Sequence, residues 1–235
     1  MSGRLFLTFD DRHIDSWVAA RPILDAAGAR ATFFVMEADE LDDRERAGLG
    51  TLLHDGHAVG SHGMRHRNAD TTIDEHGDDG YLALEIDPSI MALRELGATA
   101  RCFAYPNSRR SDATDAVLLR RFTYLRGGGP RTADLDEARI AVIPSGPAPR
   151  VLPSRGVDTG RGAVAHLADA DTLTALLRCV ADHDASLVLY AHDIAARSDA
   201  NHLHPARLAE IVAEARALGL AMHTLDDLPD EGSTP

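Results

Sequence analysis

Two neighbouring aspartates near the start of the chain are well placed to do chemistry. Asp10 and Asp11 directly follow an apolar run, residues 5–9, that has the pattern of a buried strand. Ligands of α/β proteins bind outside the carboxyl ends of parallel strands, which is where this pair would lie. Adjacent side chains on an extended backbone point to opposite sides, so one carboxylate can hold a metal while the other faces a substrate. A strand followed by a solvated acidic turn accounts for the pair equally well, because aspartate is common in turns.

Histidines supply further reactive groups. His62 and His66 are four residues apart and follow a short strand predicted at residues 57–60, so one helical turn would bring both imidazoles to the same face. Two histidines and one carboxylate form a catalytic zinc set whose fourth position is left to water. Another histidine, His192, follows the apolar run at residues 187–191. Histidines at this spacing are by themselves a common loop feature, and the acid pair on a neighbouring strand is what favours a metal site.

The remaining charge is interpreted as surface charge. The chain has 24 Lys and Arg against 37 Asp and Glu, a formal net charge of -13, which repels nucleic acid and anionic membranes. Acidic clusters at residues 39–43, 78–79 and 226–227 have no histidine at a suitable spacing. We interpret them as solvated turns and helix caps.

Strands and helices alternate along the chain, which predicts the α/β class with parallel strands. Strands are predicted at residues 5–9, 31–35, 57–60, 101–105, 122–125, 139–143, 187–190 and 221–225. Helices are predicted at residues 15–27, 81–96, 112–121, 171–184 and 205–218. The acidic stretch 37–46 is expected to lead into another helix that ends near residue 55. Pro88 should either break the helix at 81–96 or start a second helix there. A polar loop is expected up to residue 80, and a loose segment over 127–162. No linker divides the chain, so we expect one domain over residues 1–228 and a frayed tail over 229–235.

The composition also bears on the compartment. No long uncharged apolar run is present, and the first strand begins at Leu5, so neither a spanning helix nor a signal peptide is visible. Cys102 and Cys179 are too few for a disulfide scaffold and fit reduced thiols. These features predict a cytoplasmic protein without a membrane partner.

Four short motifs follow one another in a characteristic order. They are Thr-Phe-Asp-Asp at residues 8–11, His-Gly-Met-Arg-His at 62–66, Phe-Ala-Tyr-Pro at 103–106 and Leu-Tyr-Ala-His at 189–192. Their order and spacing resemble those of the polysaccharide deacetylases, the NodB-homology group that forms carbohydrate esterase family four. The resemblance runs from residue 5 to about 228. It implies a distorted (β/α) barrel.

The resemblance also implies a set of site residues. A divalent metal, usually zinc, would be held by Asp11, His62 and His66. Asp10 would act as the general base that takes a proton from the attacking water, and His192 would be the acid that protonates the departing amine. This division suits amide hydrolysis, in which a poor electrophile must be polarised and a basic leaving group protonated.

The third motif departs from the pattern of the family. The backbone N–H of Asn107, just after Tyr105 and a proline, would stabilise the oxyanion, although the family usually has tyrosine and glycine where Asn107 and Ser108 stand. Ala104 occupies the place of an arginine that pairs with the base. Arg126, at the end of another predicted strand, is the residue we expect to supply that charge.

Two further arginines were alternatives for this role. These are Arg12, where the family often has glycine, and Arg101. Plain surface charge is an equally good interpretation of Arg126.

The expected function is therefore a metal-dependent hydrolase of amide carbon–nitrogen bonds that deacetylates an N-acetylated sugar or related carbohydrate. Alternatives are a hydrolase of a small non-sugar amide or ureide on the same fold, and a non-catalytic binding or regulatory homologue. The chain has a single tryptophan, Trp17, and the segment 127–162 offers no aromatic ring for sugar stacking. A small or soluble acetylated substrate is therefore expected, rather than insoluble chitin or peptidoglycan.

Overall fold

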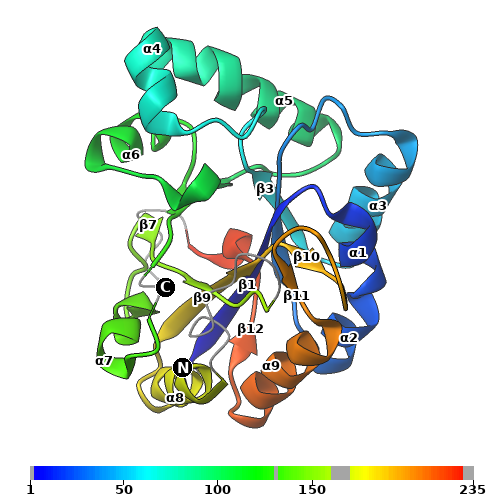
Figure 1. The fold of residues 1–235 in the computed structure, drawn as a ribbon, viewed down its shortest axis with the longest axis vertical. Helices are drawn as coiled ribbons and strands as arrows, with labels where there is room; N and C mark the ends of the chain where they lie inside the picture. Colours follow the sequence, from blue (N-terminus) through cyan, green and yellow to red (C-terminus); the bar gives the residue numbers. More distant parts are fainter. Residues whose placement is uncertain (1–2, 130–131, 160–169, 230–235) are drawn as a thin grey trace.

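A mostly parallel sheet that curves toward closure forms the centre of the molecule (Figure 1). The computed structural model describes residues 3–129, 132–159 and 170–229. The principal strands are β1 (Arg4–Asp11), β2 (Ala31–Val35), β3 (Ala58–Ser61), β4 (Cys102–Ala104), β5 (Tyr124–Arg126) and β9 (Ser186–Ala191). They are hydrogen-bonded in the order β9-β1-β2-β3-β4-β5, all in parallel, so their carboxyl ends meet at one mouth.

Residues 151–156 almost close this sheet into a ring. β7 (Val151–Leu152) pairs with β5, and β8 (Arg155–Gly156) pairs with β9, both in parallel. Only two residues separate β7 from β8. The backbone N–H of Gly127 donates to the carbonyl of Leu152 over 3.0 Å, and that of Val157 donates to Tyr190 over 2.9 Å. The arrangement is the distorted (β/α) barrel that the sequence predicted.

Helices surround the strands on the outside of the ring (Figure 1). They are α1 (Ile14–Ala19), α2 (Arg21–Ala27), α3 (Asp43–His54), α4 (Ala69–Tyr81), α5 (Asp87–Glu95), α6 (Asp112–Leu118), α7 (Leu135–Ala138), α8 (Ala170–Asp182) and α9 (Pro205–Ala217). A π-helix, η1 (Leu82–Ile86), joins α4 to α5, and a short 3-10 turn, η2 (Pro106–Ser108), follows β4. None of the described helices is long and apolar enough to cross a membrane.

The strands are buried on both faces, as parallel strands covered by helices are. All five residues of β2 are buried, and so are the six central residues of β1. The helices bury one face each: in α8 this face consists of Leu173, Leu176, Leu177 and Val180, at the spacing of successive helical turns. This packing leaves polar side chains at the strand ends, where the mouth opens.

Two helix predictions need correction. The helix predicted at 15–27 is two helices, α1 and α2, because Pro22 in the first turn of α2 cannot donate the hydrogen bond that would continue α1. Gly28 ends α2 in a left-handed conformation, as expected. The polar loop expected before residue 80 contains α4, whose sequence lacks an apolar stripe because it buries only Ala69, Thr72 and Tyr81. Pro88 opens α5, one of the two expected outcomes.

Two predicted strands are much shorter than expected. Residues 139–143 form a 3-10 turn, η3 (Arg139–Ala141), before the two-residue strand β6 (Val142–Ile143), which is antiparallel to β9. Asp134 starts α7 by accepting hydrogen bonds from Asp136 and Glu137, and the helical geometry continues into η3. Similarly, β12 (Ala221–Met222) is followed by a 3-10 turn, η5 (Leu225–Asp227). The tail predicted to fray lies outside the described residues from residue 230 on, as do parts of the segment 127–162.

Candidate active site

One carboxylate and two imidazoles converge at the mouth of the barrel. Asp11 ends β1, and His62 and His66 lie in the turn after β3. Oδ1 of Asp11 lies 3.5 Å from Nε2 of His62 and 3.5 Å from Nε2 of His66, and the two Nε2 atoms are 3.1 Å apart. Tetrahedral zinc with bonds of about 2.0–2.1 Å separates its ligand atoms by roughly 3.3 Å. These three donor atoms therefore fit one such ion.

The protonation of this triad suits metal binding. Nδ1 of His62 lies 2.8 Å from the carbonyl oxygen of Ala104 and donates to it, which leaves Nε2, the nitrogen that faces Asp11, to bind a metal once its proton is released. Burial lowers the pKa of His66, and the charge of His62 lowers it further, which keeps His66 neutral. Burial raises the pKa of Asp11, but the hydrogen bond and charge of His62, with the charges of His192 and His66, hold that pKa well below its usual range.

Two of the three candidate ligands have unusual backbone conformations. Asp11 has a φ of 80° and His66 a φ of 54°, both in the left-handed region that non-glycine residues rarely adopt. Each such residue costs on the order of 1–3 kcal/mol and persists only where its surroundings impose it. The turn between the histidines also needs Gly63, at a φ of 82°, where a Cβ would lie 3.0 Å from a carboxylate oxygen of Glu85.

Glu85 supports the histidine turn from behind. This side chain in η1 is buried, and its Oε2 accepts a hydrogen bond of 2.8 Å from the backbone N–H of Arg65. Its backbone carbonyl accepts another of 2.9 Å from Met64, and Oε1 lies 3.3 Å from Nε of Arg67. We did not single out Glu85 from the sequence. A charged residue among the apolar positions of a helix was the signal that could have found it.

Asp10 lies beside the triad and is paired with an arginine. Asp10 is buried, and Nη2 of the buried Arg126 donates to its Oδ2. The guanidinium of Arg126 also lies over the ring of Tyr190, 4.7 Å from its centroid, and 5.7 Å from that of Phe34. Oδ1 of Asp10 has no hydrogen-bond partner among the described residues. One carboxylate oxygen is thus fixed, and the other can accept a proton.

Arg126 stands beside the position where an arginine was missing. Ala104 on β4 and Arg126 on β5 are partners in the ladder between these strands, so the guanidinium comes from the neighbouring strand at the same level. The two alternatives point elsewhere: Arg12 donates to Glu45, and Arg101 donates to the carbonyl of Asp226 over 3.0 Å.

His192 is oriented by a carboxylate that the sequence did not reveal. Nδ1 of His192 lies 2.7 Å from Oδ2 of Asp158, and the backbone N–H of His192 donates to Oδ1 over 3.1 Å. Burial lowers the pKa of His192, but the hydrogen bond that its Nδ1–H donates to Asp158 and the charges of Asp10, Asp158 and Asp11 outweigh burial and raise this pKa to about 9. Trp17 holds the same residue from the other side, since its indole N–H donates to the carbonyl of His192 over 3.0 Å. Asp158 lies in the irregular segment after β8, where periodicity gave no signal.

The turn after β4 carries the remaining predicted residues. Tyr105 is buried, and its hydroxyl donates to Asp115 over 2.7 Å, which anchors the turn. Asn107 has a φ of 55°, and its side-chain amide donates to Asn68 over 3.0 Å. A cavity of about 230 Å³ lies next to this turn, lined by Ser108, Arg110, Gly128, Gly129 and Tyr190. The ring of Tyr190, which lines the cavity, also packs on Arg126, the partner of Asp10.

Comparisons with known proteins identify the class. A sequence model of the polysaccharide deacetylase family matches residues 2–122. The chain therefore belongs to the polysaccharide deacetylase family. The matched residues include Asp10, Asp11, His62 and His66, whereas Arg126, Asp158 and His192 lie beyond them. Comparison with curated proteins gives no match.

Solved structures share the fold at low sequence identity. A polysaccharide deacetylase described as putative, from Mycobacterium smegmatis, aligns with a TM-score of 0.63 and 16% identity over 100% of this chain and 96% of its own. A polysaccharide deacetylase from Bacillus cereus aligns with a TM-score of 0.59 and 16% identity over 99% of this chain and 94% of its own. The catalytic domain of a peptidoglycan N-acetylglucosamine deacetylase from Eubacterium rectale aligns with a TM-score of 0.58 and 16% identity over 100% of this chain and 91% of its own. At this level of sequence identity, the three alignments show that the fold is shared and nothing beyond it.

Proposed function

We propose that this chain is a metal-dependent hydrolase of amide carbon–nitrogen bonds that removes the acetyl group from an N-acetylated sugar. One observation carries the proposal: the triad of Asp11, His62 and His66 shares its mouth with two pre-oriented groups, the arginine-paired Asp10 and the carboxylate-paired His192. We assign this chemistry to a single catalytic domain over residues 1–228.

The triad is the proposed metal site, with zinc as the first choice. Oδ1 of Asp11 and the Nε2 atoms of His62 and His66 would be the ligands, and a bound ion would polarise the acyl carbonyl and make water more acidic. The side chain of His62 is 2% exposed, while those of Asp11 and His66 are 24% and 29% exposed. The site is therefore open to substrate on the side of Asp11 and His66.

The other groups of the chain divide the proton transfers between them. Asp10 accepts the proton of the attacking water at Oδ1, while Arg126 holds Oδ2 and stabilises the charged carboxylate. His192 is protonated at neutral pH and gives a proton to the departing amine, with Asp158 holding Nδ1 so that Nε2 faces the reaction. The backbone N–H of Asn107 is the proposed donor to the oxyanion.

The burial of the aromatic residues supports a small or soluble acetylated substrate. Every Phe, Tyr and Trp of the chain lies among the described residues and is buried. Sugar rings of a polymer stack on exposed aromatic faces, and this surface presents none. The cavity next to the turn after β4 is lined by one aromatic ring, that of Tyr190. A small non-sugar amide would suit the same cavity and is the second candidate.

Metal analysis combined with product detection tests the proposal. Purified protein should contain about one equivalent of divalent metal, and chelation should abolish acetate release from N-acetylglucosamine and its soluble oligomers. Acetate release that survives complete removal of the metal would overturn the mechanism. A protein that holds metal and hydrolyses only small non-sugar amides would overturn the substrate and leave the mechanism in place.

A further inference from the structure

The acidic segment, residues 36–45, runs from the end of β2 into the first turn of α3 and contacts both turns that carry candidate metal ligands. The backbone N–H of Met36 donates to the carbonyl of Asp11 over 3.2 Å, and that of Glu37 donates to the carbonyl of Met64 over 3.0 Å. One segment is thus hydrogen-bonded to the end of β1 and to the histidine turn. Its sequence led us to expect only solvated turns and caps; Asp42 does cap α3.

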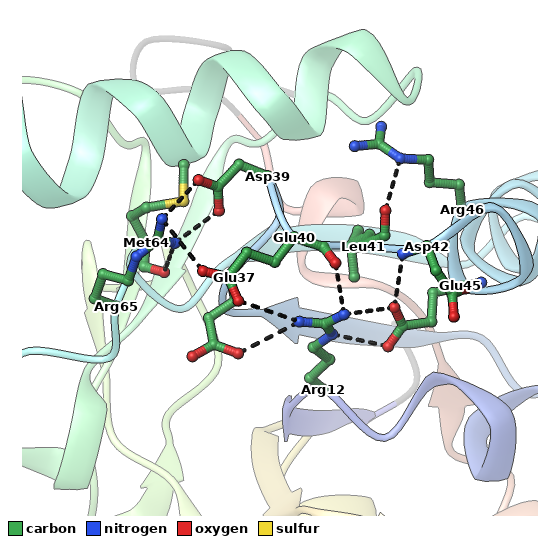
Figure 2. A network of polar contacts seen from close by, with 10 residues as sticks. All are labelled: Arg12, Glu37, Asp39, Glu40, Leu41, Asp42, Glu45, Arg46, Met64 and Arg65. Carbon is green, nitrogen blue, oxygen red and sulfur yellow. Dashed lines mark hydrogen bonds and ion pairs between the residues drawn. The ribbon is translucent and has the colours of Figure 1, made fainter.

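Two arginines strengthen these contacts, and each is the sequence neighbour of a ligand (Figure 2). Arg12, next to Asp11, donates to both carboxylate oxygens of Glu45 over 2.8 and 2.6 Å and to the carbonyl of Glu40 over 2.8 Å. Arg65, next to His66, donates to both carboxylate oxygens of Asp39 over 2.6 and 2.7 Å. Bidentate contacts between a guanidinium and a carboxylate fix the orientation of the two groups as well as the distance between them.

Glu40 joins the two arginines. Its Oε1 lies 3.5 Å from Nη2 of Arg65 and its Oε2 lies 4.0 Å from Nη1 of Arg12, while its carbonyl accepts from Arg12. Figure 2 shows the contacts that run from Arg12 through the acidic segment to Arg65. Asp11 and His66, the sequence neighbours of these two arginines, lie at the ends of this series of contacts. Both residues have left-handed backbone conformations, which persist only where the surroundings impose them.

We propose that Arg12 and Arg65, anchored on the acidic segment, are positioning residues that set the separation of Asp11 and His66 and thereby the affinity for the metal. The inference rests on the proposed metal site. The contacts hold Oδ1 of Asp11 3.5 Å from Nε2 of His66, close to the separation that one ion requires. Without the arginine side chains, only the backbone hydrogen bonds of Met36 and Glu37 join the segment to the two turns among the described residues, and part of the binding energy must restore this geometry.

The test measures metal affinity, separately from stability and turnover. Zn²⁺ and Co²⁺ dissociation constants would be determined by chelator competition for the full chain and for Arg12→Gln and Arg65→Gln. Because these ion pairs are partly exposed and act through the backbone, each substitution should weaken metal binding by about two- to fivefold. Co²⁺ absorption bands should also shift, because the geometry of the ligands changes. The melting temperature of the metal-free protein is recorded for each variant.

Arg44→Gln is the matched control. Arg44 lies in the first turn of α3, within the acidic segment, and pairs with Asp15 over 2.9 Å, but it is not adjacent to a candidate ligand. This variant should keep the metal affinity of the parent. The charge-swapped pair Arg65→Asp with Asp39→Arg should regain part of the lost affinity, and it serves as the test if Arg65→Gln does not fold.

The outcomes separate the two proposals. Parent-like affinities and Co²⁺ spectra in Arg12→Gln and Arg65→Gln overturn the positioning role and leave the metal site intact. An equal loss of affinity in Arg44→Gln also overturns it, because the effect would then be general loss of surface charge. A parent protein that binds neither ion at micromolar concentration overturns the proposed metal site and this inference with it.

Discussion

Asp10 and Asp11 are neighbours in the sequence, yet their surroundings differ. Asp11 faces two imidazoles and is partly exposed, whereas Asp10 is buried against Arg126 with one oxygen left unpaired. A residue that accepts a proton is needed for turnover but does not hold the ion. We therefore expect Asp10→Asn to retain metal and to lose about 10²–10⁴-fold in rate. Metal analysis and acetate release on the same sample check this, with Asp11→Asn, which should lose both, as the comparison. If Asp10→Asn lost its metal while Asp11→Asn kept it, Asp10 would be the metal ligand and Asp11 the proton acceptor.

At the same scale, Asp158 should control the pH dependence through His192. The acid must be protonated, so activity should fall as the pH rises through the pKa of His192, about 9. Asp158→Asn removes a charge and a charge-assisted hydrogen bond that favour the protonated imidazole. The pKa of His192 then falls, and the basic limb of the pH–rate profile moves to lower pH. A full profile of both proteins measures the shift; a basic limb that stays in place would show that His192 is not the acid.

Among the elements, the seam between β8 and β9 leaves little room for added volume. A Cβ at Gly156 would lie 2.9 Å from the ring of Tyr190, which in turn packs on Arg126 beside Asp10. Gly156→Ala should therefore cost about 1–3 kcal/mol of stability and reduce turnover as well. Gly50→Ala in α3, where a Cβ meets nothing within 4 Å, should be neutral or stabilising by up to about 1 kcal/mol. Urea unfolding of both variants gives the comparison, and equal stabilities would contradict the tight packing at this seam.

Elements with strong apolar patterns were predictable from the sequence, and those held by long-range contacts were not. β2 has the bounds that its apolar run predicted, because a fully buried parallel strand leaves a continuous hydrophobic signal. α4 was missed because it is polar over most of its length. Motif order identified the triad, while Glu85 and Asp158 act through contacts made by distant segments, which local patterns do not record. The position of Arg126 at the end of a predicted strand suggested it as the partner of Asp10, and in the structure its guanidinium donates to Oδ2 of that residue.

For the whole molecule, the distribution of aromatic rings bears on the substrate. All of them are in the core, so a long sugar chain would find no stacking surface around the mouth. We expect turnover of soluble N-acetylated mono- and disaccharides to exceed that of insoluble chitin or peptidoglycan several-fold. Acetate release at equal concentrations of acetyl groups measures the preference. Faster turnover on either polymer would reject the prediction.

The pairing of β1 also has a consequence for how the chain folds. The first strand is flanked by β2 on one side and by β9 on the other, and β9 begins at Ser186. At about 5–20 residues per second, a ribosome needs roughly ten seconds or more to reach that strand. During this interval β1 offers an open apolar edge, of the kind that pairs with other chains and that chaperones cover. Asp10 and His192 come together only when β9 docks, so a nascent chain that ends before β9 does not contain the complete candidate site.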